Sequence, residues 1–213
     1  MSPDHQQGLQ TLLDSAPVLP VLAIDRLDDA VPLARCLVDA GLPVLEVTLR
    51  TPVALEAIAV IAAAVPGAVV GAGTVLEPNQ LAATATAGAR FAVSPGAGEA
   101  LYRAGRTATI PLLPGVATAT EVMAGLAAGW RHFKFFPAAA AGGVAALKAF
   151  AGPFPRARFC PTGGIDPSNL ADYLALPNVL TVGGSWMVPA EALATGDWAR
   201  VARLAAEAVA ATR

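Results

Sequence analysis

Short apolar runs alternate with longer amphipathic stretches along most of the chain. The short runs are rich in Val, Ile and Phe, and each is followed by a turn that contains Gly, Pro, Ser or Thr. Runs of this kind are typical of buried strands, whereas the longer stretches are typical of helices. The predicted strands are 19–24, 43–49, 68–73, 90–94, 110–113, 131–136, 157–161 and 179–183. The predicted helices are 28–40, 52–64, 78–87, 98–104, 118–128, 143–150 and 167–175, with a last helix near 197–211 and a short N-terminal one at 6–14.

Strand and helix follow each other eight times, which predicts an α/β fold of the (β/α)8 TIM-barrel type. An open flavodoxin-like or Rossmann-like sheet is the alternative, but no GxGxxG motif opens a helix after the first predicted strand. The chain has 213 residues and neither a Ser/Gly-rich linker nor a charge block, so we expect one domain over residues 1–213. In a barrel, reactive groups should gather at the carboxyl ends of the strands.

Charge and hydropathy exclude several classes of partner. The formal net charge is -2, the arginines are scattered singly and the pI is near 5.6, so we expect no nucleic acid to bind. The mean hydropathy is +0.56, and residues 57–76 carry no charge, but Pro66-Gly67 interrupts that run and favours helix, turn and strand over a membrane span. The N-terminus lacks the pattern of a secretory signal, so a cytoplasmic protein is expected.

Cysteine and histidine are too sparse to indicate a metal centre. Cys36 falls in a helical pattern and Cys160 in a predicted strand, without CxxC spacing, and both are interpreted as inert core thiols. His5 and His132 are the two histidines, which are too few and too far apart for a His-rich zinc site.

Polar residues interrupt the second predicted strand with a period of two. Glu46, Thr48 and Arg50 share one face, and the apolar residues between them share the other. If the apolar face packs under the helices, the polar face points into the barrel. An interior Glu–Arg pair can also be purely structural, and that alternative stays open on this strand alone.

A lysine stands among phenylalanines in the sixth predicted strand. Alternation sends Lys134 and Phe136 inward together with His132, and Phe133 and Phe135 toward the helices. Burial and the neighbouring Arg50 disfavour an ammonium group, and a neutral amine can attack a ketone to form a Schiff base. The alternative is a structural lysine paired with Glu46.

The scarcity of lysine favours a chemical role at this position. Lys148 is the other lysine in the chain and falls on an ordinary amphipathic helix, where we interpret it as a solvated charge.

Glycine-rich turns follow the later strands. They are Gly71-Ala-Gly-Thr74, Ser94-Pro95-Gly96, Pro114-Gly115, Thr162-Gly-Gly-Ile165 and Gly183-Gly-Ser185. A single turn of this kind is weak evidence, but the pair after the last two strands lies where such barrels bind phosphate through backbone N–H groups.

Taken together, five motifs resemble those of the class I 2-keto-3-deoxy-6-phosphogluconate (KDPG) aldolases, also described as 4-hydroxy-2-oxoglutarate (KHG) aldolases. They are Glu46-Val-Thr-Leu-Arg50, Gly71-Ala-Gly-Thr74, Phe133-Lys-Phe-Phe-Pro137, Pro161-Thr-Gly-Gly164 and Gly183-Gly-Ser185. The resemblance runs from about residue 17 to 190 with the motifs in the family's order. It implies a Schiff-base aldolase that cleaves KDPG to pyruvate and D-glyceraldehyde 3-phosphate, and that also acts on 4-hydroxy-2-oxoglutarate.

The resemblance also implies roles for single residues. Lys134 would form the Schiff base, and Glu46 would be the general acid and base. The implied contacts are Arg50 and Thr74 with the pyruvate carboxylate, Pro95 and Phe136 with the same pocket, Thr162 beside the reacting carbons, and Gly163, Gly164, Gly184 and Ser185 with phosphate. The implied assembly is a homotrimer, and neither a metal nor another cofactor is implied.

Two positions depart from the family pattern. Ala138-Ala-Ala-Ala141 stands where the family usually carries a polar residue, and Arg26 only approximately matches a basic residue that closes the first strand.

Three other functions remain as alternatives. The first is an aldolase for the galactonate epimer of the substrate, which differs at C4. The second is a sugar-phosphate isomerase or epimerase in which Glu46 is the base and Lys134 only an electrostatic group. The third is a catalytically silent barrel that serves as a binding or assembly module.

Overall fold

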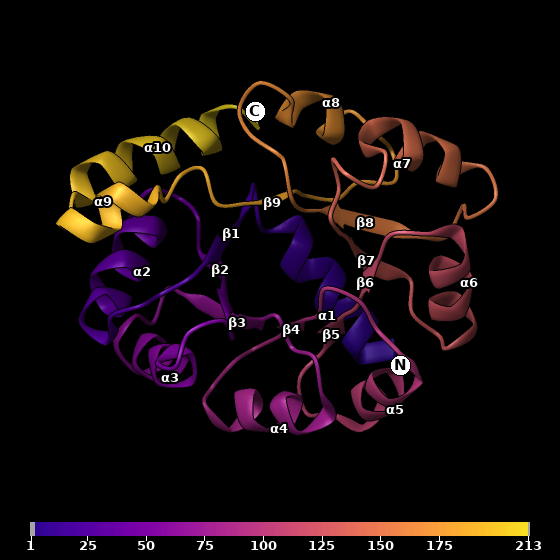
Figure 1. Ribbon diagram of the computed structural model, residues 1–213, viewed down its shortest axis with the longest axis horizontal. Coiled ribbons are helices and arrows are strands. Elements are labelled where there is room, and N and C mark those ends of the chain that lie inside the picture. Colours follow the sequence, from indigo (N-terminus) through magenta and orange to yellow (C-terminus); the bar gives the residue numbers. More distant parts are fainter. Residues whose placement is uncertain (1–2, 213) are drawn as a thin grey trace.

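The computed structural model describes residues 3–212 and shows a parallel barrel surrounded by helices (Figure 1). The strands are β1 (Leu19–Leu22), β2 (Val44–Thr48), β3 (Val69–Gly73), β4 (Ala92–Val93), β5 (Leu112–Leu113), β6 (Gly115–Val116), β7 (His132–Phe135), β8 (Arg158–Pro161) and β9 (Gly183–Gly184). Pairing is parallel throughout these strands. The predicted α/β barrel class is therefore confirmed.

The strands form two sheets that meet at both edges. One sheet has the order β5-β4-β3-β2-β1-β9 and the other β6-β7-β8. Pro114 alone separates β5 from β6 in the chain, and a parallel bridge between Thr162 and Gly183 joins β8 to β9. The fifth strand is divided because proline has no N–H to donate to the ladder. The two joints close the ring.

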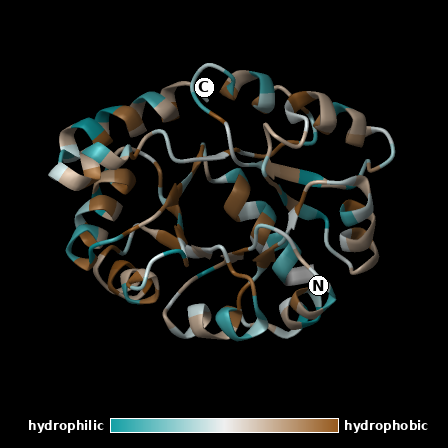
Figure 2. Cartoon of the chain, in the orientation of Figure 1, coloured by the Kyte–Doolittle hydropathy of each residue, from teal (hydrophilic) through white to brown (hydrophobic). Residues whose placement is uncertain are grey.

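Helices cover the outside of the ring and one end of it. The outer elements are η1 (Leu27–Asp29), α2 (Ala30–Asp39), α3 (Ala54–Ala64), α4 (Pro78–Thr86), α5 (Glu99–Thr107), α6 (Ala119–Ala127), α7 (Gly143–Ala151), α8 (Leu170–Leu174), α9 (Ala190–Thr195) and α10 (Trp198–Ala210). Figure 2 shows hydrophobic residues along the strands and a mixture of hydrophobic and hydrophilic residues along these helices, the amphipathic pattern expected of helices packed on a barrel.

Helix α1 (Pro3–Asp14) crosses the barrel and closes one end of it (Figure 1). Leu9 and Leu13 are buried in one cluster with residues of the barrel interior, among them Phe91, which precedes β4, and Leu113 of β5. This inner cluster is separate from the larger one between strands and outer helices. The amphipathic N-terminal helix expected at 6–14 is thus confirmed, and its apolar face fills the amino end of the barrel.

The structure differs from the expected elements near the C-terminus and in strand length. The last predicted strand, 179–183, is an isolated bridge at Val179 followed by the two-residue β9, and helix α9 was not predicted. Helix α9 spans only six residues, which is too short for a helical periodicity to be visible. The charge-free run at 57–76 divides into α3, a turn and β3, as expected.

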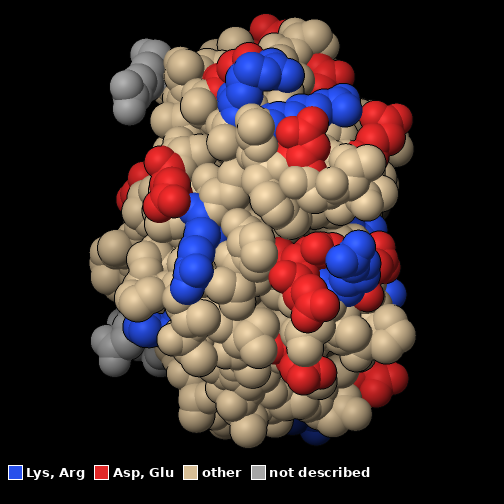
Figure 3. All heavy atoms as spheres, turned by 90° about the vertical axis from the view of Figure 1, so that its left-hand side faces the viewer, with Lys and Arg blue, Asp and Glu red and all other residues tan. Residues whose placement is uncertain are grey.

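The surface agrees with the charge pattern of the chain. On the face that lies to the left in Figure 1, acidic and basic side chains are interspersed without a single-sign patch (Figure 3). Within residues 3–212, no helix combines the length and the apolar character needed to cross a membrane.

Candidate active site

Lys134 and Glu46 meet inside the barrel. The Lys134 Nζ atom lies 3.0 Å from Glu46 Oε1, and the side chains are 7% and 0% exposed. Lys134 comes from β7 and Glu46 from β2, 88 residues apart in the chain. The inward direction predicted for both residues from strand alternation is therefore confirmed. The contact alone fits either a catalytic pair or the structural ion pair considered as the alternative.

Glycines on β3 make room for the Glu46 carboxylate. A Cβ atom added at Gly73 would lie 2.2 Å from Glu46 Oε1 and 2.7 Å from its Cγ, so only glycine fits there. The other carboxylate oxygen, Glu46 Oε2, is buried and has no hydrogen-bond partner among the described residues. A buried acceptor without a partner is costly in a purely structural pair, which indicates that a further donor is to be bound here.

Aromatic residues surround the lysine on both sides of β7. Phe133 and Phe135 face outward and pack with Phe159, as alternation predicted. The Lys134 Nζ atom lies 5.2 Å from the centroid of the Phe136 ring, so Phe136 borders the site. The phenylalanines therefore hold the strand against the helices while the amine points into the barrel.

Cys160, the β8 residue in register with Lys134, is fully enclosed. Burial raises the pKa of its thiol to about 12, so it stays protonated at neutral pH. Cys36 is only half-buried on α2, and its Sγ lies 3.3 Å from the Trp198 carbonyl oxygen. The expectation of inert thiols agrees with both positions.

Arg50 lies beyond the end of β2 with part of its guanidinium uncommitted. Its Nε atom donates to Thr48 Oγ1 at 3.0 Å, and the Thr48 hydroxyl donates to the Leu22 carbonyl at 2.7 Å. The terminal nitrogens of Arg50 have no acceptor within the described part of the chain. The guanidinium is therefore held through Nε, and its terminal N–H groups remain available to bind a carboxylate. Thr74 follows Gly73 with φ 59, a backbone conformation rare for threonine.

Pro95 and Thr162 lie beside the strands that flank Lys134. A Cβ atom at Gly115 would lie 2.2 Å from the Pro95 carbonyl, and Gly115 is the β6 residue in register with Lys134. Thr162 follows β8, and its N–H donates to the Phe135 carbonyl at 2.9 Å. Both predicted pocket residues therefore belong to the same end of the barrel as Phe136.

The glycine-rich turns at 162–165 and 183–185 contain backbone N–H groups without an acceptor among the described residues. Gly163 and Gly164 have φ +98 and +75, and an L side chain would be strained at either position. The carbonyls of Thr162 and Gly163 accept from the 138–139 loop, but no described residue accepts from the N–H groups of Gly163, Gly164 or Ser185. Gly184 lies on β9 directly before Ser185. Unpaired N–H groups in glycine turns form the kind of cradle that binds phosphate.

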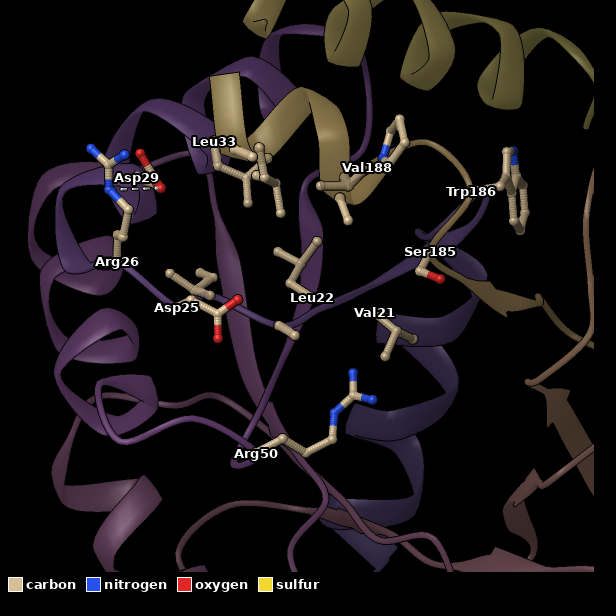
Figure 4. Close-up of a pocket in the computed structure, with 16 residues that line it drawn as sticks. Val21, Leu22, Asp25, Arg26, Asp29, Leu33, Arg50, Ser185, Trp186 and Val188 are labelled. Atoms are coloured by element: carbon tan, nitrogen blue, oxygen red, sulfur yellow. Dashed lines mark ion pairs between the residues drawn. The ribbon is translucent and has the colours of Figure 1, made fainter. Parts of the chain in front are cut away.

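A cleft of about 640 Å³ opens where β1 and β9 end (Figure 4). Arg50 extends into it toward Val21, Ser185 lies on its wall, and Arg26 turns toward Asp29, 3.6 Å away. Glu46 is in register with Val21, and Thr48, which accepts from Arg50 Nε at 3.0 Å, follows Glu46 by two residues on the same face of β2, so the Arg50 guanidinium is held on the side of the Lys134–Glu46 pair.

The cleft wall also contains residues that sequence patterns did not identify. Trp186, Val188 and Leu193 line it from the segment around α9. These are ordinary hydrophobic residues, and only the fold brings them to the cleft. The Ala138–Ala141 loop does not line this cleft, and Ala138 is buried.

Comparisons with known proteins agree with this geometry. A model of the aldolase family described as KDPG and KHG aldolase matches residues 9–204. The KHG/KDPG aldolase of Escherichia coli K12 is 56% identical over 200 residues, which cover 94% of each chain. The KDPG aldolase of Legionella pneumophila, crystallised with pyruvate captured as a covalent carbinolamine intermediate, gives a TM-score of 0.91 at 50% identity and covers 93% of this chain and 96% of its own.

The KDPG aldolase of Zymomonas mobilis ZM4, crystallised with 3-phosphoglycerate, also gives a TM-score of 0.91 at 50% identity, with 96% of both chains covered. The match covers nearly the whole chain, including β2, β7 and the glycine turns, at an identity that leaves no doubt of common descent. This chain belongs to the KDPG and KHG aldolase family.

Proposed function

We propose that this protein is a class I aldolase that cleaves KDPG to pyruvate and D-glyceraldehyde 3-phosphate, and that it also accepts 4-hydroxy-2-oxoglutarate. The observation that carries the proposal is the buried Lys134–Glu46 pair, 3.0 Å apart, below a cleft that Arg50 enters. Family membership favours this function over an isomerase and over a silent barrel, and the carbinolamine trapped in the Legionella relative supports lysine chemistry.

Lys134 and Glu46 would share the first half of the reaction. The Lys134 amine attacks the C2 keto carbon and forms a carbinolamine, and Glu46 protonates its hydroxyl, which leaves as water. The product is a protonated imine between Lys134 and C2. Glu46 Oε2, which has no partner among the described residues, is the free position for this proton transfer.

Carbon–carbon cleavage would use the same two groups. The Glu46 carboxylate takes the proton of the C4 hydroxyl, the C3–C4 bond breaks, and its electron pair moves through C3 to the imine nitrogen. D-Glyceraldehyde 3-phosphate leaves and an enamine remains on Lys134. Glu46 then returns a proton to C3, and water hydrolyses the imine to pyruvate and the free amine.

Other residues would position the substrate. Arg50, with its open guanidinium edge, and Thr74 would bind the carboxylate, and Pro95, Phe136 and Thr162 would enclose the reacting carbons. Phosphate would bind at Gly163, Gly164, Gly184 and Ser185, where the N–H groups of Gly163, Gly164 and Ser185 have no partner among the described residues, and the 3-phosphoglycerate in the Zymomonas relative supports a phosphate subsite. Arg26, at the cleft but paired with Asp29, is a further phosphate contact.

The proposal also covers the domain organisation, the assembly and the cellular location of the enzyme. We expect residues 1–213 to act as one domain and the protein to be a homotrimer. A cytoplasmic location is part of the proposal and is supported by two free cysteines, which suit a reducing compartment.

Trapping with borohydride tests the covalent step, and the chain provides its own control. Incubation with pyruvate and sodium borohydride should reduce the imine and leave a pyruvyl adduct on Lys134, detected by peptide mass analysis. Lys148, exposed on α7, should stay unmodified. Lys134→Ala should lose both adduct and KDPG cleavage, whereas Lys148→Ala should keep both. Absence of an adduct on Lys134 in the active wild-type protein would exclude Schiff-base catalysis there.

Comparing KDPG with its C4 epimer and with 4-hydroxy-2-oxoglutarate in one coupled assay tests the substrate. We expect the highest kcat/KM with KDPG. A higher value with the epimer would make the galactonate aldolase the correct function.

A further inference from the structure

A second cleft, of about 540 Å³, lies at the amino ends of the strands. Its lining residues are Gln6, Gln7, Gln10, Arg131, His132, Pro155, Arg156 and Arg158. His132 and Arg158 are the first residues of β7 and β8, whereas Arg50 and Ser185 follow the last residues of β2 and β9. Because the strands are parallel, this cleft is at the end of the barrel opposite the proposed catalytic site. Helix α1 supplies its glutamines.

Three arginines give the cleft an unbalanced positive charge. Among the described residues, no carboxylate lies within 4.0 Å of Arg131, Arg156 or Arg158. Arg158 Nη1 donates to the carbonyls of Pro155 and Ala157 at 3.0 and 2.9 Å, which fixes this guanidinium against the loop before β8. Unpaired guanidiniums around one concavity are an arrangement that attracts anions.

His132 adds a buried imidazole nitrogen that has no hydrogen-bond partner among the described residues. It is 5% exposed, and its Nε2 lies 2.8 Å from Gln10 Oε1. The Gln10 amide is oriented because its nitrogen donates to Asp14 Oδ1 at 2.8 Å, so His132 Nε2 donates to the amide oxygen. His132 Nδ1 is buried and has no hydrogen-bond partner in the described part of the chain. The imidazole therefore has one nitrogen committed to α1 and one that is not.

The charged groups around His132 oppose its protonation. Burial lowers the pKa of His132, Arg158 and then Arg131 lower it further, and Asp14 opposes them. These groups come from β8, the loop before β7, and α1, the elements packed around the imidazole. A bound anion would offset the arginine charges and so favour the imidazolium form.

We propose that this cleft is a second ligand site that binds a small phosphorylated anion carrying at least two negative charges. The arginine fork matches phosphate oxygens in pairs, and three arginines can neutralise more charge than a single carboxylate carries. The volume lies in the range of sites for small molecules, so the ligand is a metabolite-sized phosphate compound. The site is independent of the proposed aldolase reaction.

Imidazole NMR with pyrophosphate tests the site directly. The chain has two histidines, so a ¹⁵N-labelled sample gives two sets of imidazole signals, one from each ring, and His132→Gln assigns them. Added sodium pyrophosphate, with ionic strength held constant by NaCl, should shift the His132 signals to saturation and raise the pKa of His132. Orthophosphate should bind more weakly because it carries less charge.

Matched variants separate this site from the catalytic end. Arg131 and Arg156 are both exposed, so the double variant Arg131→Gln/Arg156→Gln should fold and should bind pyrophosphate about tenfold or more weakly. Arg200→Gln, on α10, and Ser185→Ala, in the proposed catalytic phosphate turn, should leave the His132 response unchanged.

Three results would overturn the proposal. They are a His132 signal that does not saturate with pyrophosphate, an equal affinity in the double variant, and a response lost in Ser185→Ala. Citrate at the same ionic strength should bind more weakly than pyrophosphate, and a reversed order would be a fourth result against the proposal, because it would exclude a phosphate-selective site.

Discussion

At the scale of the residue, the proposed active site depends on the position of the Glu46 carboxylate. Glu46 is fully buried, with one oxygen on Lys134 Nζ and the other without a partner among residues 3–212. A purely structural ion pair would be expected to satisfy both oxygens, because a buried acceptor that lacks a hydrogen bond costs about 1–3 kcal/mol. The open oxygen is the position from which Glu46 would exchange protons with the substrate in the proposed reaction.

Substituting Glu46 by Gln tests that role. The amide keeps the shape and can still accept a hydrogen bond from Lys134, but it cannot carry the proton. We expect the exchange of pyruvate methyl protons with solvent, followed by NMR in D₂O, to fall by about 10²- to 10⁴-fold. Glu56→Gln, an exposed change on α3, should exchange at the wild-type rate. An unchanged rate in a folded Glu46→Gln protein would rule out Glu46 as the acid and base.

At the scale of the element, β3 leaves the space that the Glu46 carboxylate occupies. Its glycines face into the barrel, and the space that their side chains would fill is occupied by the Phe91 ring at Gly71 and by Glu46 at Gly73. The strand could be built from valine on backbone grounds alone, since β-branched residues favour strands. Glycine is needed at both positions because the Phe91 ring and the Glu46 side chain occupy the interior of the narrow barrel next to them.

Gly73→Ala should therefore impair catalysis more than folding. The added methyl group would meet the Glu46 carboxylate at 2.2 Å and displace it from Lys134. We expect kcat for KDPG cleavage to fall by about 10²-fold, as misplacement by about 1 Å can do, while circular dichroism still shows a folded barrel. Gly152→Ala, where nothing lies within 4 Å of the new Cβ, is the matched control and should be fully active. Normal kcat in Gly73→Ala would show that the Glu46 position is not critical.

At the scale of the whole molecule, the barrel separates the two proposed anion sites. The carboxyl end carries Arg50, Ser185 and the glycine turns, and the amino end carries the arginine cleft closed by α1. Helix α1 contributes to both ends, because its apolar face fills the barrel below the Lys134–Glu46 pair and its glutamines line the second cleft.

The assembly is also a prediction at this scale. We expect multi-angle light scattering to give three times the 21.4 kDa mass of the chain, independent of protein concentration over the micromolar range. A monomer mass with full aldolase activity would show that trimer formation is not needed, and a dimer would contradict the expected symmetry.

The sequence by itself determined the alternation of strand and helix, the inward direction of Lys134 and Glu46, and the glycine turns. These are local properties, because periodicity and turn chemistry act over a few neighbouring residues. The amphipathic pattern of α1 was also visible, but not that it closes the barrel.

Only the tertiary structure decided which distant groups meet. Closure of the ring brings Lys134 to Glu46 across 88 residues, joins β8 to β9 through one bridge, and places α9 on the cleft wall. It also sets His132 against Gln10 and gathers three scattered arginines into one cleft. No local pattern encodes such contacts, because they depend on how the whole sheet curls and closes. That closure also gives Lys134, which stands among phenylalanines in the sequence, a carboxylate partner inside the barrel.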